Sequence, residues 1–248
     1  QFLRLLFGRA PHVMKPAWLK IDLTSKKSTG ETAGILAKHH LNTICTSGLC
    51  PNRSECWMAR TATLMIGGDI CTRKCRFCNT LSGRPRLLNP DEPRHVAESV
   101  KALKLRYAVI TSVDRDDLPD YGAAHWIKTI EEIRRLNPDT KIELLIPDFM
   151  GKADLIRQVM ATRPHVAGHN METVRRLTPS VRSVARYERS LDVLREIANC
   201  GVISKTGFML GLGETHEEIL ETMDDILSTG CQRLTLGQYL QPTVDHLP

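Results

Sequence analysis

Two patterns of apolar residues alternate along the chain after residue 60. Short runs rich in β-branched residues are typical of buried strands, and apolar residues at helical spacing are typical of amphipathic helices. Five stretches predict helices, with apolar stripes that begin near Val96, Trp126, Leu155 and Leu191 and a capping-box pattern at Thr215. Six runs predict strands, at residues 64–66, 107–113, 141–146, 165–167, 202–210 and 233–239.

This alternation indicates a parallel sheet, because parallel neighbours are joined by a crossover that is usually a helix. Six such units favour an α/β fold, a closed or partial barrel, and we expect a partial (β/α)6 barrel. In such barrels the chemistry takes place at the carboxyl ends of the strands. Residues 1–60 lack the alternation. We therefore expect a barrel core over residues 61–248, preceded by an N-terminal extension, residues 1–60, with its own cysteine ligands.

Composition and charge exclude several classes of protein. The 248 residues are 42% hydrophobic and 25% charged, as in an ordinary globular protein. No apolar run approaches the roughly 18 residues of a membrane span. A net charge of +6 is far from the basic character of nucleic-acid-binding proteins, and 5% aromatic residues are too few for a surface that stacks on bases. We expect neither membrane nor nucleic acid as a partner.

The N-terminal residues are basic, with no acid before Asp22. The apolar residues 2–7 are too few for a secretory signal. Two interpretations stay open: an organelle transit peptide, or translation from Met14 after extraneous residues. The expected compartment is the cytoplasm, or the mitochondrial matrix in a eukaryote.

Cysteine placement carries most of the functional information. A chain of this length buries a core without disulfides, so we interpret clustered thiols as metal ligands in a reducing compartment. Two isolated cysteines, Cys200 and Cys231, are interpreted as plain buried thiols. The other six form an x4, x5 triplet and an x3, x2 triplet: Cys45, Cys50 and Cys56, then Cys71, Cys75 and Cys78.

Three closely spaced thiolates suit an iron–sulfur cluster, because they hold three irons and leave a fourth open for chemistry. The second triplet follows the first predicted strand and so lies at the reactive end of the barrel. Zinc is the alternative, although structural zinc commonly takes four ligands in paired Cys-x2-Cys knuckles, which neither triplet forms. His39 or His40 could complete a zinc site with the first triplet.

The second triplet, with the aromatic Phe77 before its last cysteine, resembles the signature of radical S-adenosylmethionine (SAM) enzymes. The glycine-rich stretch 207–214 resembles the motif that packs near the adenine in those enzymes. The first triplet, with segments 111–117, 205–214 and 234–242, narrows the resemblance to the lipoyl synthases. This resemblance extends from about residue 16 to the end of the chain.

In lipoyl synthases the second triplet holds the four-iron, four-sulfur (4Fe–4S) cluster that binds SAM, and the first holds an auxiliary 4Fe–4S cluster. The resemblance implies that two sulfur atoms from the auxiliary cluster are inserted at C6 and C8 of an octanoyl group on a carrier lysine. Saturated carbon offers no acidic proton, so a cofactor-borne radical is needed. The implied ligands are Cys71, Cys75 and Cys78 for the catalytic cluster and Cys45, Cys50 and Cys56 for the auxiliary cluster.

Other implied residues lie after the predicted strands. Without the resemblance, residues 111–117 would be interpreted as an exposed acidic turn with Arg115 paired to a neighbour. His169 is interpreted as a satisfied core histidine, while Lys205 and Arg189 stay open between contact with substrate or a carboxylate and solvated surface charge. The residues implied to contact SAM are Phe77, Ser112, Asp114, Asn170 and Gly211.

The resemblance also implies partners: octanoylated lipoyl carriers (2-oxoacid dehydrogenase E2 and the glycine cleavage H protein) and reduced ferredoxin or flavodoxin. The family's fourth auxiliary ligand is a serine in an Arg-Ser-Ser-Tyr motif, which is absent before Pro248; we interpret this as truncation. Competing interpretations are another radical SAM enzyme, such as a methylthiotransferase or biotin synthase, a non-catalytic iron–sulfur electron carrier, and a zinc-stabilised scaffold.

Overall fold

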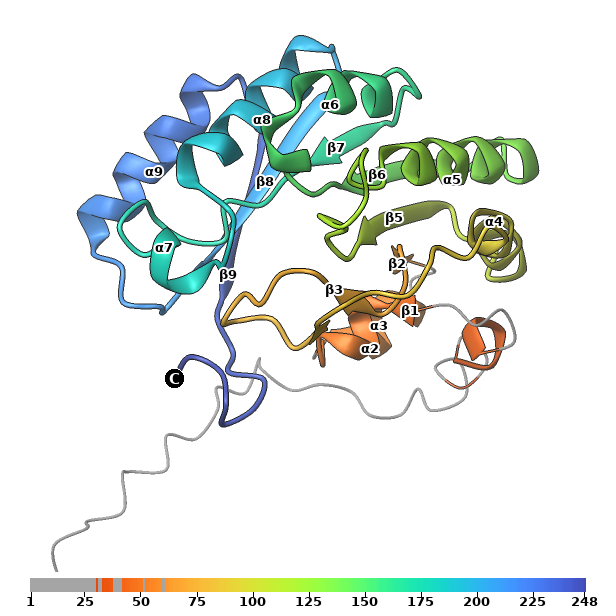
Figure 1. The fold of residues 1–248 in the computed structure, drawn as a ribbon, viewed down its shortest axis with the longest axis horizontal. Coiled ribbons are helices and arrows are strands. Elements are labelled where there is room, and N and C mark those ends of the chain that lie inside the picture. The colour runs from red at the N-terminus through yellow and green to blue at the C-terminus, as the bar shows by residue number, and fades with distance from the viewer. Residues whose placement is uncertain (1–29, 31–32, 38–41, 51, 59–60) are drawn as a thin grey trace, which may run out of the picture.

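The computed structural model describes residues 30, 33–37, 42–50, 52–58 and 61–248. Its main feature is a single seven-stranded sheet that curves around the centre of the molecule (Figure 1). The strands follow one another in sequence order along the sheet: β1 (Asn42–Thr43), β2 (Thr61–Ile66), β5 (Tyr107–Ser112), β6 (Lys141–Leu145), β7 (Val166–Gly168), β8 (Ile203–Leu210) and β9 (Arg233–Gln238).

The strand pairing confirms the predicted partial barrel. From β2 to β9 every neighbouring pair is parallel, whereas β1 pairs antiparallel with β2. Within the described residues β1 and β9 are the two edges of this sheet and do not pair with each other. The barrel is therefore open, and its six parallel strands are the six that the apolar runs predict. Gly168 permits a close approach of β7 to β8, because a Cβ atom on it would lie 2.8 Å from the Lys205 carbonyl oxygen.

Helices cover the outer face of the sheet (Figure 1). The predicted capping box is present, since the Glu218 N–H donates to the Thr215 hydroxyl and the Thr215 N–H donates to the Glu218 carboxylate. Shorter helical turns are α2 (Ile44–Ser47), α3 (Arg53–Met58), η1 (Phe149–Gly151) and α7 (Thr178–Val181). The five predicted helices are α4 (Glu92–Ala102), α5 (Ala123–Leu136), α6 (Ala153–Met160), α8 (Tyr187–Asn199) and α9 (His216–Ser228).

The hydrophobic core lies between these helices and the sheet. Trp126, Ile130 and Ile133 of α5 are buried, as are Leu64 and Ile110 on neighbouring strands. Each such side chain contributes about 1.5–3 kcal/mol by leaving water. Parallel strands covered in this way are apolar on both faces, which is why their runs are nearly continuous in the sequence.

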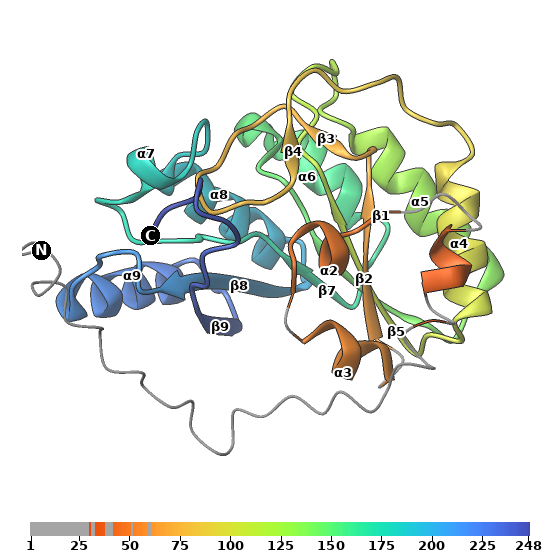
Figure 2. The same cartoon turned by 90° about the horizontal axis from the view of Figure 1, so that it is seen from below.

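The N-terminal extension shares this core. Leu36, Cys45 and Trp57 belong to the same buried cluster as the barrel strands, and α2 and α3 both pack on β2 (Figure 2). The proposed boundary at residue 60 therefore separates two segments with one common core. Whether they are separate folding units stays a prediction.

Cys231 is buried as predicted, but the prediction for Cys200 is wrong because its side chain is exposed. Cys200 follows the last turn of α8 as its C-cap, where the chain leaves the core. No helix in the described part of the chain is long and apolar enough to cross a bilayer. The alternatives for residues 1–29 lie outside the described residues.

Candidate functional site

The second cysteine triplet lies on a long loop at the carboxyl end of β2. Gly67 and Gly68 adopt positive φ angles, 84° and 98°, and turn the chain out of the sheet. The loop then forms the two-stranded ribbon β3 (Ile70–Cys71) and β4 (Leu81–Ser82). Its position matches the predicted reactive end of the barrel. The three cysteines line a common cavity of about 260 Å³.

The surroundings of Cys71 suit a thiolate ligand. Its sulfur lies 3.4 Å from the Arg73 amide nitrogen and 3.3 Å from the Asp114 amide nitrogen, so both N–H groups donate to it. Burial, and then the Asp114 carboxylate, raise the pKa of the Cys71 thiol to about 12. Burial also raises the pKa of Cys75. A cationic cluster offsets such a cost, because thiolates bind metal with loss of their protons.

The arrangement differs from that of a single bound ion. Among the described residues, no group of three or more His, Cys, Asp or Glu side chains is placed to hold one metal ion. A four-iron cluster separates its thiolates more widely than one zinc ion does. Three thiols around one cavity match the ligand set of a four-iron cluster with one open iron.

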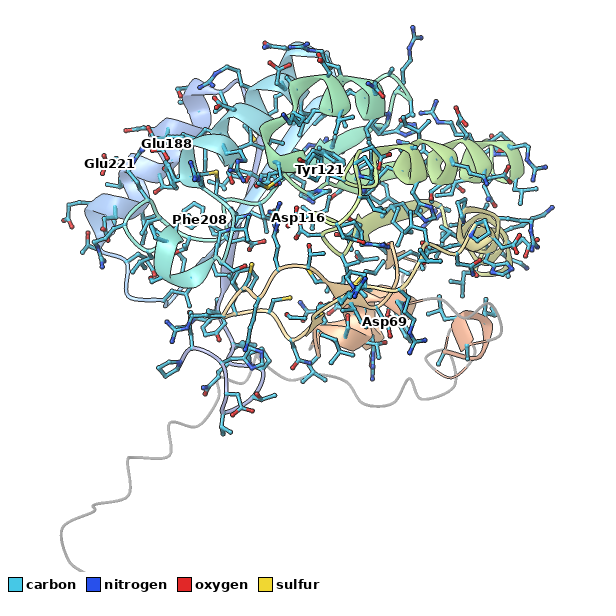
Figure 3. The ribbon with its side chains drawn as sticks, viewed as in Figure 1. Asp69, Asp116, Tyr121, Glu188, Phe208 and Glu221 are labelled. Carbon is cyan, nitrogen blue, oxygen red and sulfur yellow. The ribbon has the colours of Figure 1, made fainter. Side chains whose placement is uncertain are left out.

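Arg73 organises the acidic residues beside the loop, and sequence analysis did not identify it. The side chain is 3% exposed. Its guanidinium donates two hydrogen bonds to Asp116, at 2.7 and 2.8 Å, and one to Asp148, at 2.6 Å; Asp116 is labelled in Figure 3. It also lies 3.3 Å from Asp114. One buried cation thus joins the cysteine loop to the loops after β5 and β6.

The charges around Arg73 divide the acids into two kinds. Burial raises the pKa of Asp114 to about 6, although the charge of Arg73 opposes the shift. Burial also acts to raise the pKa of Asp148. The hydrogen bond and the charge of Arg73 outweigh burial there and hold the pKa of Asp148 below its ordinary value. Arg115 pairs with Asp117 at 2.8 Å. The pairing expected for an ordinary turn is therefore present beside the predicted SAM contacts.

Four of the five predicted SAM-contact residues line the same cavity as the cysteines: Phe77, Ser112, Asp114 and Asn170. Ser112 also borders a smaller cavity beside α5, and its buried hydroxyl has no hydrogen-bond partner among the described residues. A buried polar group without a partner calls for an explanation, and a bound ligand would be one. The fifth predicted residue, Gly211, lines neither the cavity of the cysteines nor the second cavity described below. It adopts φ 100° at the end of β8, and its N–H donates to Glu214.

His169 and Arg182 form a buried pair behind this cavity. The His169 ring nitrogens lie 2.9 Å from the Ile146 carbonyl oxygen and 3.0 Å from the Ser190 hydroxyl, as expected for a satisfied core histidine. Burial, followed by the charge of Arg182, lowers the pKa of His169 to about 4. Arg182 lines the cavity, and its buried Nε–H has no partner among the described residues. Sequence analysis missed this residue because one arginine among many carries no local signal.

A second cavity, of about 340 Å³, occupies the barrel lumen. It shares Ile44, Leu145, Asn170 and Glu172 with the first cavity, so the two are contiguous. Gly237 borders it, and a Cβ atom there would meet nothing within 4 Å. A barrel interior is ordinarily filled with large side chains, and glycine leaves this one open.

The two basic residues left open by the sequence are both paired. Lys205 lines the lumen cavity, and its ammonium donates to the Glu143 carboxylate at 2.6 Å. Arg189 donates to Asp148 at 3.1 Å. Neither is simply a solvated surface charge. Their partners are neighbours in the sequence: Glu143 lies in β6, and Asp148 lies in the loop that follows it.

The first cysteine triplet lies in the N-terminal segment that packs on β2. Cys45 is in α2, Cys50 follows it, and Cys56 is in α3. Burial raises the pKa of Cys56, and the charges of the Cys50 and Cys45 thiols raise it further. Ile44, next to Cys45, borders both cavities. His39 and His40 lie outside the described residues.

Comparison with known proteins agrees with this geometry. A sequence model of the Radical SAM superfamily matches residues 65–226. The fold is similar to that of Streptococcus suis SuiB bound to the precursor peptide SuiA, with a TM-score of 0.61 and 13% identity over 88% of this chain and 45% of that one. It is equally similar to HydG, a maturase of the [FeFe]-hydrogenase, with a TM-score of 0.60 and 13% identity over 90% and 58%. The fold and the cysteine loop define a radical SAM enzyme.

Close relatives narrow this class. The lipoyl synthase of Porphyromonas gingivalis W83 is 62% identical over 96% of this chain and 85% of its own length. That of Bacteroides fragilis YCH46 is 58% identical over 97% and 84%, and that of Treponema denticola is 53% identical over 94% and 80%. The chain belongs to the lipoyl synthase family. A 4Fe–4S cluster, SAM and a lipoyl-carrier substrate follow from this membership.

Proposed function

We propose that Cys71, Cys75 and Cys78 hold the SAM-binding 4Fe–4S cluster of this lipoyl synthase. The observation that carries the proposal is the first cavity, which the three cysteines line together with Ser112, Asn170 and Arg182. The residues fit the group, because SAM brings amine, carboxylate and ribose atoms that need such partners. When bound there, the cluster supplies the electron that cleaves SAM to a 5′-deoxyadenosyl radical.

The chain's own residues would orient SAM and keep water away. Ser112, Asn170 and Arg182 would bind its polar groups, and the pKa of Asp114, raised to about 6 by burial, lets that carboxyl hold or release a proton near neutral pH. His169 stays neutral there, because burial lowers its pKa to about 4. Phe77 adds an apolar wall. The role of Gly211 stays a prediction, with no contact at the cavity to support it.

The lumen cavity would receive the octanoyl chain. Its wall is mainly apolar, and it adjoins the cavity proposed for SAM. An octanoyl group held there would lie next to that cavity. Holding the reactants in this way converts a bimolecular step into an effectively unimolecular one. Exclusion of water protects a radical from side reactions.

Cys45, Cys50 and Cys56 would hold the auxiliary 4Fe–4S cluster on the other side of the lumen. The Cys50 and Cys45 thiols are close enough to Cys56 to raise its pKa, and Ile44 next to Cys45 borders both cavities. The auxiliary cluster supplies the two sulfur atoms for insertion. Octanoylated E2 and H-protein domains would be the carriers, and reduced ferredoxin or flavodoxin the electron donor. A net charge of +6 favours encounter with acidic partners of either kind.

Two measurements test this function. Anaerobic reconstitution should give about eight irons per chain with matching sulfide, as two four-iron clusters require. Incubation with SAM, reductant and an octanoyl-lysine peptide should then give a product carrying two added sulfur atoms by mass spectrometry. Stoichiometric zinc without iron would contradict the cluster assignment. A different sulfur-containing product would favour another radical SAM reaction, and clusters without SAM cleavage would favour an electron carrier.

A further inference from the structure

The segment after β9 returns to the cysteine loop, as the end of the chain in Figure 1 shows. Tyr239, the first residue after the strand end at Gln238, is buried. Its N–H donates to the Leu210 carbonyl at 2.9 Å, and its hydroxyl donates to the Leu247 carbonyl at 2.8 Å. These bonds tie both ends of residues 239–247 to the barrel and to each other.

Two hydrogen bonds then join this segment to the turn that carries Cys75 and Cys78. The Leu247 N–H donates to the Arg76 carbonyl at 3.3 Å. The His246 ring nitrogen Nε2 lies 3.1 Å from the Cys78 carbonyl oxygen. Within the turn itself, the Cys78 N–H donates to the Cys75 carbonyl at 3.1 Å. The peptide of Cys78 is therefore held from both sides, by its own turn and by a residue 168 positions away.

The neighbours of His246 favour the tautomer in which Nε2 carries the proton and donates. A carbonyl oxygen only accepts, so the proton must be on Nε2 for the bond to Cys78 to form. Nδ1 then accepts, and it lies 2.8 Å from the Thr243 hydroxyl, which can donate to it. The same hydroxyl accepts from the Asp245 N–H at 3.3 Å. The Gln241 amide donates to the His246 carbonyl at 3.0 Å and fixes the backbone.

We propose that His246 is a positioning residue for the SAM-binding cluster. It would fix the Cys78 peptide, and its N–H dipole would partly neutralise the carbonyl next to the cluster. Reduction makes the cluster more negative, so a positive dipole nearby favours the reduced state and raises the reduction potential. The inference rests on the proposed function of Cys78 as a cluster ligand. It adds a residue from the far end of the sequence to the machinery that starts the radical reaction.

The test compares variants of the full chain after anaerobic reconstitution, with iron and sulfide measured in each. His246→Phe removes the donor and keeps a ring, whereas His246→Gln retains an N–H donor. Tyr239→Phe is the matched control, because it removes a hydrogen bond of the same segment without touching the Cys78 carbonyl. The readouts are the SAM-induced change in the electron paramagnetic resonance spectrum, the midpoint potential of that signal, and the rate of 5′-deoxyadenosine formation.

His246→Phe should keep the parent iron content, move the potential to lower values and lose roughly 10-fold in rate, as for other outer partners of metal ligands. His246→Gln should recover part of both effects, and Tyr239→Phe should match the parent. Parent-like behaviour of His246→Phe, or equal losses in Tyr239→Phe, would overturn the proposal. Only the SAM-binding cluster changes its spectrum with SAM, so the auxiliary cluster does not interfere.

Two further variants keep the test decisive. If His246→Phe fails to fold, Thr243→Val removes the hydroxyl that sets the tautomer and should give a smaller loss in rate and potential; no loss would count against His246. Cys78→Ala separates the two proposals. A SAM-induced spectral change that survives in Cys78→Ala would refute the proposed ligand assignment itself, whatever His246 does.

Discussion

The two cysteine triplets differ in how they are anchored. The loop of Cys71, Cys75 and Cys78 is held by partners from across the barrel, through Arg73 and through residues 239–247. In the other triplet, Cys45 and Cys56 lie in helices of four and six residues, α2 and α3, and Cys50 lies between them, next to a two-residue strand. Its cysteine backbone bonds are local, such as Cys50 N–H to the Cys45 carbonyl at 3.2 Å.

This contrast matches the two tasks proposed for the clusters. The proposed SAM-binding cluster would have to survive each turnover, so a loop cross-linked to several strand ends suits it. The proposed auxiliary cluster would give up its sulfur and would have to be rebuilt, so a site on short helical segments at a sheet edge suits release and reloading. Local stability within one protein commonly varies in this way, with functional exchange drawn from the less stable parts.

The largest expected effect separates the triplets chemically. Cys75→Ala should abolish SAM cleavage, because the SAM-binding cluster loses one of its three thiolates. The auxiliary cluster should stay in place. Chromatography of 5′-deoxyadenosine and an iron count near half of the parent would check this. Undiminished 5′-deoxyadenosine formation would break the assignment of the second triplet.

The converse variant, Cys50→Ala, should retain SAM cleavage but insert no sulfur. The reason is that the radical site remains complete while the sulfur source is lost. Mass spectrometry of the octanoyl-lysine peptide reads out the product, with 5′-deoxyadenosine measured in the same samples. Lipoyl product in the absence of added sulfide would remove the first triplet from its role as donor site.

A smaller effect, on stability, is expected from Arg73→Met. Removing one member of a buried ion cluster typically costs about 3–5 kcal/mol, because the remaining charges are left uncompensated. Urea unfolding followed by circular dichroism measures the change in the free energy of unfolding. Arg94→Met is the matched control: Arg94 is an exposed arginine that pairs with Asp91 and Glu98, and such pairs contribute up to about 1 kcal/mol. Equal losses in the two variants would show that Arg73 does not anchor the loop.

The smallest effect tests the link between the two regions. The amide of Asn79, in the loop that carries Cys71, Cys75 and Cys78, donates to the Ser47 carbonyl in α2 at 2.7 Å. Asn79→Ala should weaken this link by about 1 kcal/mol and speed amide hydrogen exchange of residues 42–58 by roughly fivefold, with the barrel strands unchanged. Ser82→Ala removes a bond within the same loop, to the Arg73 carbonyl, and should leave residues 42–58 unaffected. Equal acceleration in both would deny the link its specific role.

Local features of the chain were enough to predict the secondary structure and the class of chemistry. Strand and helix runs depend on local periodicity, so the six parallel strands, the five long helices and the Thr215 capping box could all be predicted. The spacing of the cysteines is also a local feature, and it identified both triplets as candidate cluster ligands. The connection order of parallel strands then required the second triplet to lie at their carboxyl ends.

Which polar residues meet depends on how distant parts of the chain pack together. Arg73 contacts Asp116 and Asp148, which are 43 and 75 positions away, and His246 reaches Cys78 across 168. No periodic signal marks such residues, because their partners are chosen by how the strand ends and the returning chain converge. The exposure of Cys200 has the same origin, since it depends on where α8 ends relative to the core. Local pattern thus specified the elements, and packing specified the site.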